Sequence, residues 1–414
     1  MDYIVYVISK DGKPLMPITR RGKVRHLLRD KAAKIVNYHP FTIQLTTETR
    51  HEVDEVTLGI DTGYQHVGLS ATTKNHVLYE SKNELRTDLV KNIKTKKRAR
   101  QVRRSRKLRY RKPRFLNRKR SKGWLPPSIK SRLDCHLNLV AKVHKILPIS
   151  KVVVEVAKFD IQKIKNPDIK GVEYQQGEQL GFWNVREYVL DRDNHTCQCC
   201  KGKSGSDILQ THHITPRKDG GSNAPSNLVT LCKPCHDDLH AHNKTLNIEI
   251  DNTSYKAETF MSILRKYLVI GLREKYDNVK CTYGYITKYT RIKNHLKKDH
   301  NIDARCISGN PLAKPNGEVY IVKKVRCHNR QLHKFKTSKG GKRKINQSPY
   351  IVHGYRLFDT VNFNGKICFV YSRRTSGSFL IKDIDGNTIS ESINYKKLKL
   401  VEKRKGWIFD VRKS

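Results

Sequence analysis

The residues best suited to chemistry crowd the stretch between Cys197 and His240. It contains two CxxC pairs, which are Cys197 with Cys200 and Cys232 with Cys235. Four thiolates at this spacing can complete the tetrahedral shell of one zinc ion and leave no open position, which indicates a structural metal. Cys199 is an alternative ligand within the first pair, although the spacing favours Cys197 and Cys200.

Four histidines accompany these cysteines and need a different role. His212 and His213 are adjacent, so on a strand they point to opposite faces. His236 and His240 are four residues apart and share one face of a helix. A cation held between strand and helix would stabilise the charge that grows on a phosphodiester, and a neutral imidazole would deprotonate water. A lone histidine is usually a surface or structural residue, but four framed by two CxxC pairs predict a catalytic metal site.

This arrangement resembles the HNH nuclease family in its zinc-stapled form, with His213, Asn227 and His236 as the named trio. The resemblance implies that His213 is the general base and that Asn227 orients its imidazole. It also implies that His212 and His236 bind one magnesium ion, with His240 as a further candidate ligand. Some members of the family carry an aspartate where His212 stands.

A second set of candidates is scattered along the chain. Asp61 ends an apolar run within a GIDTG motif, and Glu155 interrupts the VVVEV run of a strand that reads as buried. His300 and Asp303 are three residues apart, on one face of a helix. Asp61, Glu155 and Asp303 can together hold two magnesium ions about 3.5–4 Å apart, with His300 activating water. From spacing alone, three unrelated surface or capping acids explain the pattern equally well.

The net charge indicates the kind of partner. The 414 residues include 84 lysines and arginines against 38 aspartates and glutamates, a formal net charge of +46. Such an excess repels itself in a compact state unless a polyanion neutralises it, so nucleic acid is the first partner to consider and an anionic membrane the second. We find no apolar run of the ~18–20 residues that a membrane span needs and no signal-peptide pattern, and therefore expect neither membrane insertion nor secretion.

Residues 91–122 concentrate this charge, with no acid among them. The centre, residues 94–112, lacks glycine and proline and is rich in helix formers. A charge run is often solvated or disordered. Because this one lies inside the chain between well-patterned segments, we favour a long helix that orders against phosphates. The candidate nucleic-acid contacts are Arg98, Arg100, Arg103, Arg104, Arg106, Lys107, Arg109, Arg111 and Arg114.

Other patterns predict the elements that must position these residues. Apolar runs at residues 56–61, 67–71 and 76–79 predict an antiparallel meander, and residues 151–156 predict a further buried strand. Helical spacing predicts helices over residues 128–147 and 256–273. Beyond residue 316, short strands separated by turn signals predict a small β-barrel. Its Arg373, Arg374 and Lys382 are either nucleic-acid contacts or solvated charges.

The order of these features resembles that of the IscB family, transposon-encoded RNA-guided nucleases related to the large CRISPR effectors with HNH and RuvC domains. A GIDTG strand, a basic helix, a VVVEV strand, an HNH-like insertion and an HxxD segment follow a KPLMP segment near residue 13. The resemblance implies a mixed α/β, multidomain fold with an RNase H-like (RuvC) core. It implies the following parts: an N-terminal PLMP-type domain (1–53), RuvC-I (54–90), an arginine-rich bridge helix (91–122), RuvC-II with its flanking helix and linker (123–180), an inserted zinc-stapled ββα-metal HNH domain (181–250), RuvC-III (251–312) and a basic, β-barrel-like wedge or target-adjacent-motif-interacting domain (313–414).

The same resemblance implies an RNA-guided endonuclease that cuts double-stranded DNA. A structured guide RNA (omega RNA) would neutralise the charge in a monomeric ribonucleoprotein located in a prokaryotic cytoplasm and on the nucleoid when bound to DNA. The HNH site, with one Mg²⁺ and a structural Zn²⁺ nearby, would cut the guide-paired strand. The RuvC-like site, with two Mg²⁺, would cut the displaced strand. Two alternatives remain: a guide-independent HNH endonuclease of homing or restriction type, and a non-catalytic RNA-binding scaffold.

Overall fold

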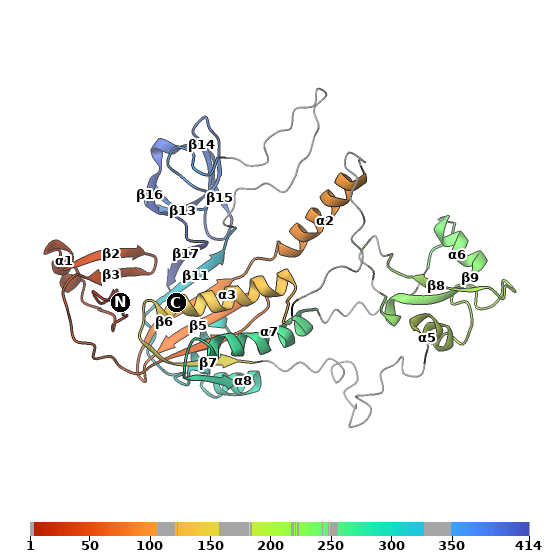
Figure 1. The fold of residues 1–414 in the computed structure, drawn as a ribbon, viewed down its shortest axis with the longest axis horizontal. Helices are drawn as coiled ribbons and strands as arrows, with labels where there is room; N and C mark the ends of the chain where they lie inside the picture. The colour runs from red at the N-terminus through yellow and green to blue at the C-terminus, as the bar shows by residue number, and fades with distance from the viewer. Residues whose placement is uncertain are drawn as a thin grey trace. The chain divides into compact units, whose positions relative to one another are not determined.

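The chain folds into two compact units (Figure 1). The computed structural model describes residues 4–105, 121, 123–156, 182, 184–216, 219, 221, 223–241, 243–246, 248, 256–326 and 349–413. Unit 1 is discontinuous and consists of Met1–Lys158 and Phe260–Ser414, whereas unit 2 is Phe159–Thr259. Unit 2 is therefore an insertion in the sequence of unit 1. In the part of the chain that the structure describes, no helix is long and apolar enough to cross a membrane.

A seven-stranded mixed sheet forms the centre of unit 1, in the order β10-β7-β4-β5-β6-β11-β17. The predicted meander is confirmed, because β5 pairs antiparallel with both β4 and β6. β7 and β10 extend the sheet as parallel strands on the other side of β4. The strands are β4 (Val56–Asp61), β5 (His66–Thr72), β6 (Val77–Glu84), β7 (Ile149–Glu155), β10 (Val279–Thr282), β11 (Glu318–Lys324) and β17 (Trp407–Lys413).

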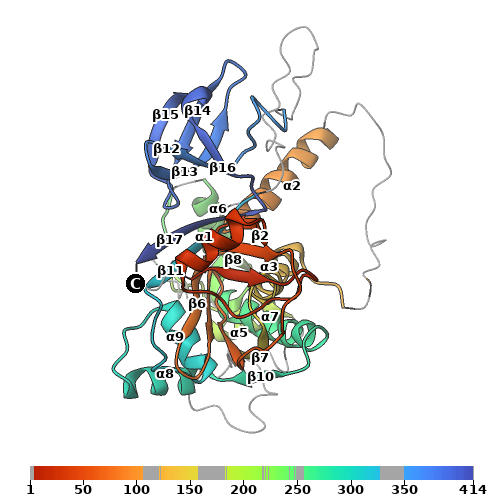
Figure 2. The ribbon, with the colours of Figure 1, turned by 90° about the vertical axis from the view of Figure 1, so that its left-hand side faces the viewer.

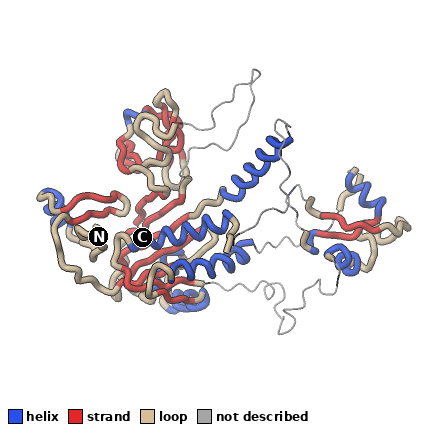
Figure 3. Tube along the Cα trace, viewed as in Figure 1, coloured by secondary structure: helices blue, strands red, loops and turns tan. Residues whose placement is uncertain are grey.

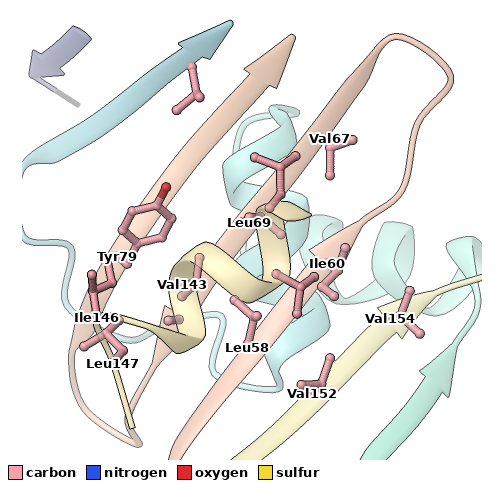
Figure 4. Close-up of a cluster of buried hydrophobic side chains, with 14 of the residues drawn as sticks. Leu58, Ile60, Val67, Leu69, Tyr79, Val143, Ile146, Leu147, Val152 and Val154 are labelled. Carbon is pink, nitrogen blue, oxygen red and sulfur yellow. The ribbon is translucent and has the colours of Figure 1, made fainter. Parts of the chain in front are cut away.

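One face of this sheet is apolar and packs against helices. Side chains alternate between faces along a strand, so Leu58 and Ile60 of β4 lie on the same face as Val152 and Val154 of β7. They join one buried cluster with residues of α3 (Pro127–His144) and α7 (Lys256–Arg273), among them Val143 (Figure 4). The same alternation turns the intervening residues of both strands to the opposite face.

Helix α9 (His300–Ser308) covers that opposite face at unusually close range. A Cβ added to Gly59 of β4 would lie 2.0 Å from the carbonyl oxygen of Ala304, and one added to Gly68 of β5 would lie 1.9 Å from that of His300. Only glycine permits this approach of helix backbone to strand backbone. The two glycines therefore set how deeply the start of α9 sits on the sheet.

Helix α9 lies against β6 (Figure 2), and a buried ion pair joins the two elements. Glu80 is 1% exposed and accepts hydrogen bonds from Arg305 Nε at 2.8 Å and from Asn301 Nδ2 at 2.9 Å. Both partners lie on α9, whose N-terminus carries His300. A buried carboxylate must be paired, and these two donors satisfy Glu80 from the helix that it anchors.

We expect Glu80→Ala to destabilise unit 1 by about 3–5 kcal/mol, because it leaves the Arg305 guanidinium buried without its counter-charge. Thermal unfolding of the full chain measures this. The matched control is Glu84→Ala on the same strand, where Glu84 pairs with Lys323 at 2.6 Å and is 41% exposed. A solvent-exposed pair contributes about 0–1 kcal/mol. Equal shifts of the two midpoints would contradict an anchoring role for Glu80.

Smaller elements complete unit 1. In the N-terminal sheet, β3 (Phe41–Leu45) lies between β1 (Tyr6–Ile8) and β2 (Ala33–Tyr38), accompanied by α1 (Arg21–Arg29). The tail forms a five-stranded sheet in the order β15-β14-β13-β12-β16 (Figure 2). Its elements are β12 (Thr360–Phe363), β13 (Lys366–Arg373), β14 (Ser378–Lys382), β15 (Thr388–Asn394), η4 (Tyr395–Lys397) and β16 (Lys399–Glu402).

The sequence predicts a small β-barrel beyond residue 316, and this prediction needs correction for the first and last strands of that region. β11 pairs with β6, and β17 pairs with β11, so the first and last strands of the tail extend the central sheet. Buried Val322 and Trp407, one on each strand, belong to the main core cluster. The adjacent residues on the two strands, Ile321 and Ile408, pack in a second cluster with Phe369 of β13, so β11 and β17 contribute to both cores.

Unit 2 is a short hairpin with flanking helices (Figure 3). β8 (Leu209–His213) pairs antiparallel with β9 (Leu228–Cys232), with helix α5 (Val185–Arg192) before the hairpin, the short helix η3 (Pro225–Asn227) just ahead of β9, and α6 (Lys233–His240) after it. Its small apolar cluster includes Cys197, Cys232 and Cys235 together with Leu231. A core this small needs further crosslinking to be stable alone.

Candidate active sites

Two acids meet at one edge of the central sheet. Asp61 is the last residue of β4 and Glu155 the last of β7, and the parallel register pairs Ile60 with Val154. Asp61 and Glu155 are the next residues after this pair, so they lie side by side on neighbouring strands. Both are on the face opposite to the apolar core. The sequence prediction that these two distant acids are neighbours in space agrees with this register.

His300 joins them from the first residue of α9. The Asp299 carboxylate accepts a hydrogen bond from the His300 backbone nitrogen at 2.8 Å and caps the helix. The His300 ring stacks on His66, with 5.4 Å between centroids, and its Nδ1 lies 2.6 Å from Asp61 Oδ2. Because a carboxylate accepts the bond, Nδ1 carries the proton, and this hydrogen bond raises the pKa of His300. Nε2 is then the nitrogen able to take a proton from water.

Helix α8 (Gly284–Lys293) supplies two partners that sequence reasoning did not identify. Thr287 donates a hydrogen bond to Glu155 Oε2 at 2.5 Å, and Arg291 forms an ion pair with Asp303 at 2.8 Å. Gly284 allows the helix close to Glu155, whose Oε1 would lie 3.1 Å from an added Cβ. No motif in the sequence distinguishes Thr287 or Arg291, because ordinary helix residues acquire these roles only through the packing of α8.

Asp61, Glu155 and Asp303 affect one another's ionisation. Burial and then the charges of Asp61 and Asp303 raise the pKa of Glu155. Burial and then the Asp61 charge raise the pKa of Asp303. Carboxylate oxygens are the donor type that a hard cation such as Mg²⁺ prefers, although in the described residues these three acids do not bring their ligand atoms within 4.8 Å of one another.

The described part of the basic helix is α2 (Leu89–Ser105). Arg98 and Arg100 lie on it, and Arg103 and Arg104 occupy its last turn in the backbone trace. The predicted contacts that lie outside the described residues are Arg106, Lys107, Arg109, Arg111 and Arg114. The expectation of a helix is confirmed from residue 94 to residue 105.

In unit 2, the two CxxC pairs converge. The sulfur atoms of Cys197, Cys200, Cys232 and Cys235 all lie within 4.8 Å of one another, with 3.7 Å between those of Cys200 and Cys232. A tetrahedron with Zn–S bonds of ~2.3 Å has edges of about 3.8 Å, so the four thiols fit one zinc ion. Cys199, the alternative ligand, is not one of this group. The contact with Ser204 lowers the pKa of Cys200 to about 6, which favours the thiolate that zinc binds.

Cys232→Ser should unfold unit 2, because structural zinc supplies about 10–16 kcal/mol to small domains of this kind. The expected result is loss of one bound zinc per chain, measured by atomic absorption, together with rapid proteolysis between residues 184 and 246. Cys199→Ser is the matched control and should keep its zinc. Retention of stoichiometric zinc by Cys232→Ser would contradict the assignment.

A second cluster in unit 2 consists of imidazoles. Ligand nitrogens of His212 on β8 and of His236 and His240 on α6 lie within 4.8 Å of one another. Burial and the charges of His236 and His240 lower the pKa of His212 to about 4. Neutral imidazole is the form that binds metals. The structure thus brings together all three predicted ligands, and His240 belongs to the cluster as fully as His236.

His213, next on the strand, points to a different partner. Its Nε2 lies 2.9 Å from the side-chain oxygen of Asn223, a residue that the sequence analysis did not identify. An amide oxygen accepts, so Nε2 carries the proton and Nδ1 is the basic nitrogen. Asn227 binds the backbone of Thr215 through both side-chain groups, at 2.9 and 3.1 Å. Asn227 therefore holds the segment that follows His213.

Arg192 and Asp193 support this geometry from the end of α5. Arg192 donates to the carbonyl oxygens of Pro225 and Leu228, at 2.8 and 2.9 Å, on either side of Asn227. The Asp193 carboxylate accepts a hydrogen bond from the backbone nitrogen of Thr230 at 2.8 Å. The start of β9 is therefore fixed by charged side chains as well as by the hairpin.

Comparison with known families agrees with this arrangement. Residues 197–242, which contain the thiols and the imidazoles, match the family model described as HNH endonuclease. The chain carries an HNH endonuclease domain. Residues 5–177 match a second model, described as RRXRR protein, and this range includes Asp61, α2 and Glu155.

Individual relatives match shorter parts. Over 63 residues the chain is 33% identical to the type IV methyl-directed restriction enzyme EcoKMcrA of Escherichia coli K12, an alignment that covers 14% of this chain and 22% of that enzyme. The chain thus spans less than a quarter of this curated relative.

Two solved structures align more broadly but loosely. Streptococcus thermophilus Cas9 in complex with an AGGA PAM aligns with 12% identity and a TM-score of 0.30, covering 45% of this chain and 26% of that chain. The type II-C Cas9 of Actinomyces naeslundii aligns with 13% identity and a TM-score of 0.17, covering 69% and 50%. Scores this low do not establish a common fold.

Proposed function

We propose that this protein is an RNA-guided endonuclease that cuts both strands of DNA with two separate sites. The observation that carries the proposal is the convergence of Asp61, Glu155, His300 and Asp303, which are distant in sequence, on one face of the sheet in unit 1. The HNH domain supplies the second site from unit 2. Two hydrolytic centres in one chain suit a duplex, whose strands must each be cut.

The strand order and directions of β6-β5-β4-β7-β10 support an RNase H-like, RuvC-type core. Magnesium bound by Asp61, Glu155 and Asp303 would stabilise the charge that develops on the phosphate. Asp61 holds the His300 ring through Nδ1, which leaves Nε2 to accept the proton of the attacking water. Thr287 and Arg291 hold the carboxylates of Glu155 and Asp303. We propose that this site cuts the displaced strand.

In unit 2, His213 is proposed as the general base for the guide-paired strand. Asn223 keeps the proton on Nε2, so that Nδ1 can accept a proton from water. Asn227 positions the segment around Thr215 that follows the base. His212, His236 and His240 would hold a cation that stabilises the phosphodiester in its transition state.

The donor atoms of this second metal site do not suit Mg²⁺, which prefers oxygen ligands; three imidazoles suit Zn²⁺, Ni²⁺ or Co²⁺. We expect Ni²⁺ to bind zinc-loaded protein in calorimetric titrations and His240→Ala to bind it at least roughly tenfold more weakly. The control His26→Ala alters an exposed histidine on α1 and should bind as the wild type does. Mg²⁺ binding that depends on His240 would contradict this preference.

RNA guidance is supported by the net charge of +46 and by the basic segment that begins with α2. The segment 91–122 contains no acid and is helical over its described part up to Ser105, which suits the phosphate backbone of a structured RNA. Sequence choice would then rest on base pairing with the guide, while the protein reads backbone shape and a short flanking motif. The expected assembly is one protein chain with one guide RNA.

The test is purification of the full chain from its native host, followed by sequencing of any copurifying RNA. We expect one discrete RNA species and Mg²⁺-dependent cleavage of a plasmid that matches it. EDTA should abolish cleavage, and a plasmid with a scrambled target should stay intact. Absence of a specific RNA, or equal cleavage of both plasmids, would contradict guidance.

The second candidate is a guide-independent HNH endonuclease, which the identity with a curated restriction enzyme favours. Such an enzyme would cut DNA after removal of all RNA by ribonuclease. It leaves the cluster of Asp61, Glu155, His300 and Asp303 without a role. The ribonuclease-treated protein therefore separates the two candidates directly.

A further inference from the structure

A cavity of about 510 Å³ lies in unit 1 and involves neither candidate active site. Its walls come from the β2–β3 hairpin, from α3, from β11 and from the segment that joins β16 to β17. The cavity is large enough for a small-molecule ligand. Nothing in the function proposed above assigns it a role.

The lining of this cavity is strongly cationic. Six lysine and arginine residues line it against a single acidic residue, Glu402. Glu402 already lies 3.0 Å from Lys405 Nζ and 3.8 Å from His39 Nδ1. The six are Lys142, Lys145, Lys324, Lys403, Arg404 and Lys405. So large an excess of one sign in a partly enclosed space favours the binding of an anion.

Two of these cations lie over aromatic rings of β17. Lys142 Nζ lies 5.6 Å from the ring centre of Phe409, and Lys324 Nζ lies 4.7 Å from that of Trp407. Burial, followed by the charges of Lys405 and Lys324, lowers the pKa of Lys142. Trp407 and Phe409 are two residues apart on β17 and so share one face of that strand, which brings both ammonium groups to the same wall of the cavity. A phosphate bound there would offset the repulsion between the two charges.

Other groups in the lining match the rest of a nucleotide. Tyr79 and Trp407 give the cavity an aromatic wall, and Asn37 and Asn138 add side-chain amides. Unpaired RNA bases are commonly bound between apolar walls and amide groups, and the 2′-hydroxyl adds a donor and an acceptor. Double-stranded RNA is contacted across its wide minor groove, whereas the bases of a single strand can be splayed out, so a single-stranded segment fits a cavity better.

We propose that this cavity binds one unpaired nucleotide of an RNA, with its phosphate between Lys142 and Lys324. The identity of the strand as RNA rests on the proposed function, whereas the anion site rests on the cavity alone. A nucleotide seated here would contact the N-terminal sheet, α3 and β17 together. Because the RNA would bind only folded unit 1, its binding would raise the free energy of unfolding of unit 1.

Trp407 provides a local signal for the test. In full-length protein with Trp124→Phe and Trp183→Phe, Trp407 is the one remaining tryptophan. We expect a ten-nucleotide oligo(U) RNA to change its fluorescence, and Lys142→Met with Lys324→Met to abolish that change. The double variant should bind the RNA roughly tenfold more weakly, with a salt slope lower by about 0.7. The control pair Lys74→Met with Lys366→Met alters two exposed lysines and should keep the Trp407 response.

Each other outcome overturns a defined part of the proposal. An unchanged Trp407 signal in the Lys142→Met, Lys324→Met variant, with its thermal midpoint preserved, would overturn the site. An equal response to oligo(dT) would contradict the proposal that the strand is RNA. A full response to inorganic phosphate at the same concentration would contradict the proposal that the ligand is a nucleotide. Guide-dependent DNA cleavage, measured in parallel, reports on the proposed function independently of all three.

Discussion

Replacing Asp61 with asparagine is expected to stop cleavage of the displaced strand and to leave cleavage of the guide-paired strand intact, and His213→Ala should do the reverse. Asp61 is a proposed metal ligand, and its Oδ2 lies 2.6 Å from His300 Nδ1. His213 is the proposed base of the other site, and loss of a general base costs about 10²–10⁴-fold in rate. Each variant should therefore convert plasmid into an open circle and not into linear DNA.

Strand-specific end labels on a short target duplex show which strand each variant cuts. The controls are Asp54→Asn and His51→Ala, which alter exposed residues ahead of β4 and should cut both strands. Loss of both cuts in either single variant, with RNA binding retained, would contradict two independent sites. Cleavage of both strands by His213→Ala would refute its role as the base.

Gly68→Ala is expected to remove cleavage of the displaced strand although glycine has no side chain to take part in the reaction. The added Cβ would lie 1.9 Å from the His300 carbonyl oxygen, so the N-terminus of α9 must move. Overpacking of this kind costs about 1–3 kcal/mol of stability. A displacement of ~1 Å at a catalytic group can cost about 10²-fold in rate. His300 and Asp303 move with the helix, whereas unit 2 is untouched.

The control for this variant is Gly22→Ala in α1. An added Cβ at Gly22 meets nothing within 4 Å, and alanine stabilises a helix by roughly 0.5–1 kcal/mol relative to glycine. The Gly22→Ala variant should therefore cut both strands, and its thermal midpoint should be slightly higher than that of the wild type. If Gly68→Ala cuts the displaced strand as the wild type does, then cleavage does not depend on the close packing of α9 against Gly68.

Strand identity was predictable because alternation and apolar runs report directly on burial. β4 begins and ends at the predicted residues, and the meander through β5 and β6 follows from short connections between alternating segments. The thiol and imidazole clusters were also predictable, because CxxC pairs and an i, i+4 histidine pair are local patterns. In each case the spacing of the residues in the sequence determines which side chains point to the same side of an element.

The supporting partners were not predictable, since they depend on how elements pack. Thr287 and Arg291 are ordinary residues of α8 until that helix lies beside β7. Asn223 contacts His213 across ten residues of sequence, at a spacing that matches no local motif. Arg373 is a further example: it donates to the carbonyl oxygens of Pro349, Tyr350 and Tyr355, so its guanidinium has a structural role within the tail.

The discontinuity of unit 1 has a consequence for synthesis on the ribosome. β7 is complete at Glu155, but its outer neighbour β10 starts at Val279 and α9 ends at Ser308. All of unit 2 is translated in that interval. Because domains generally fold as they emerge, we expect the inserted unit to acquire its metal first. Until β10 is translated, the outer edge of β7 in the nascent sheet is unpaired. The carboxylate centre, which needs α9, therefore forms after the metal site of unit 2.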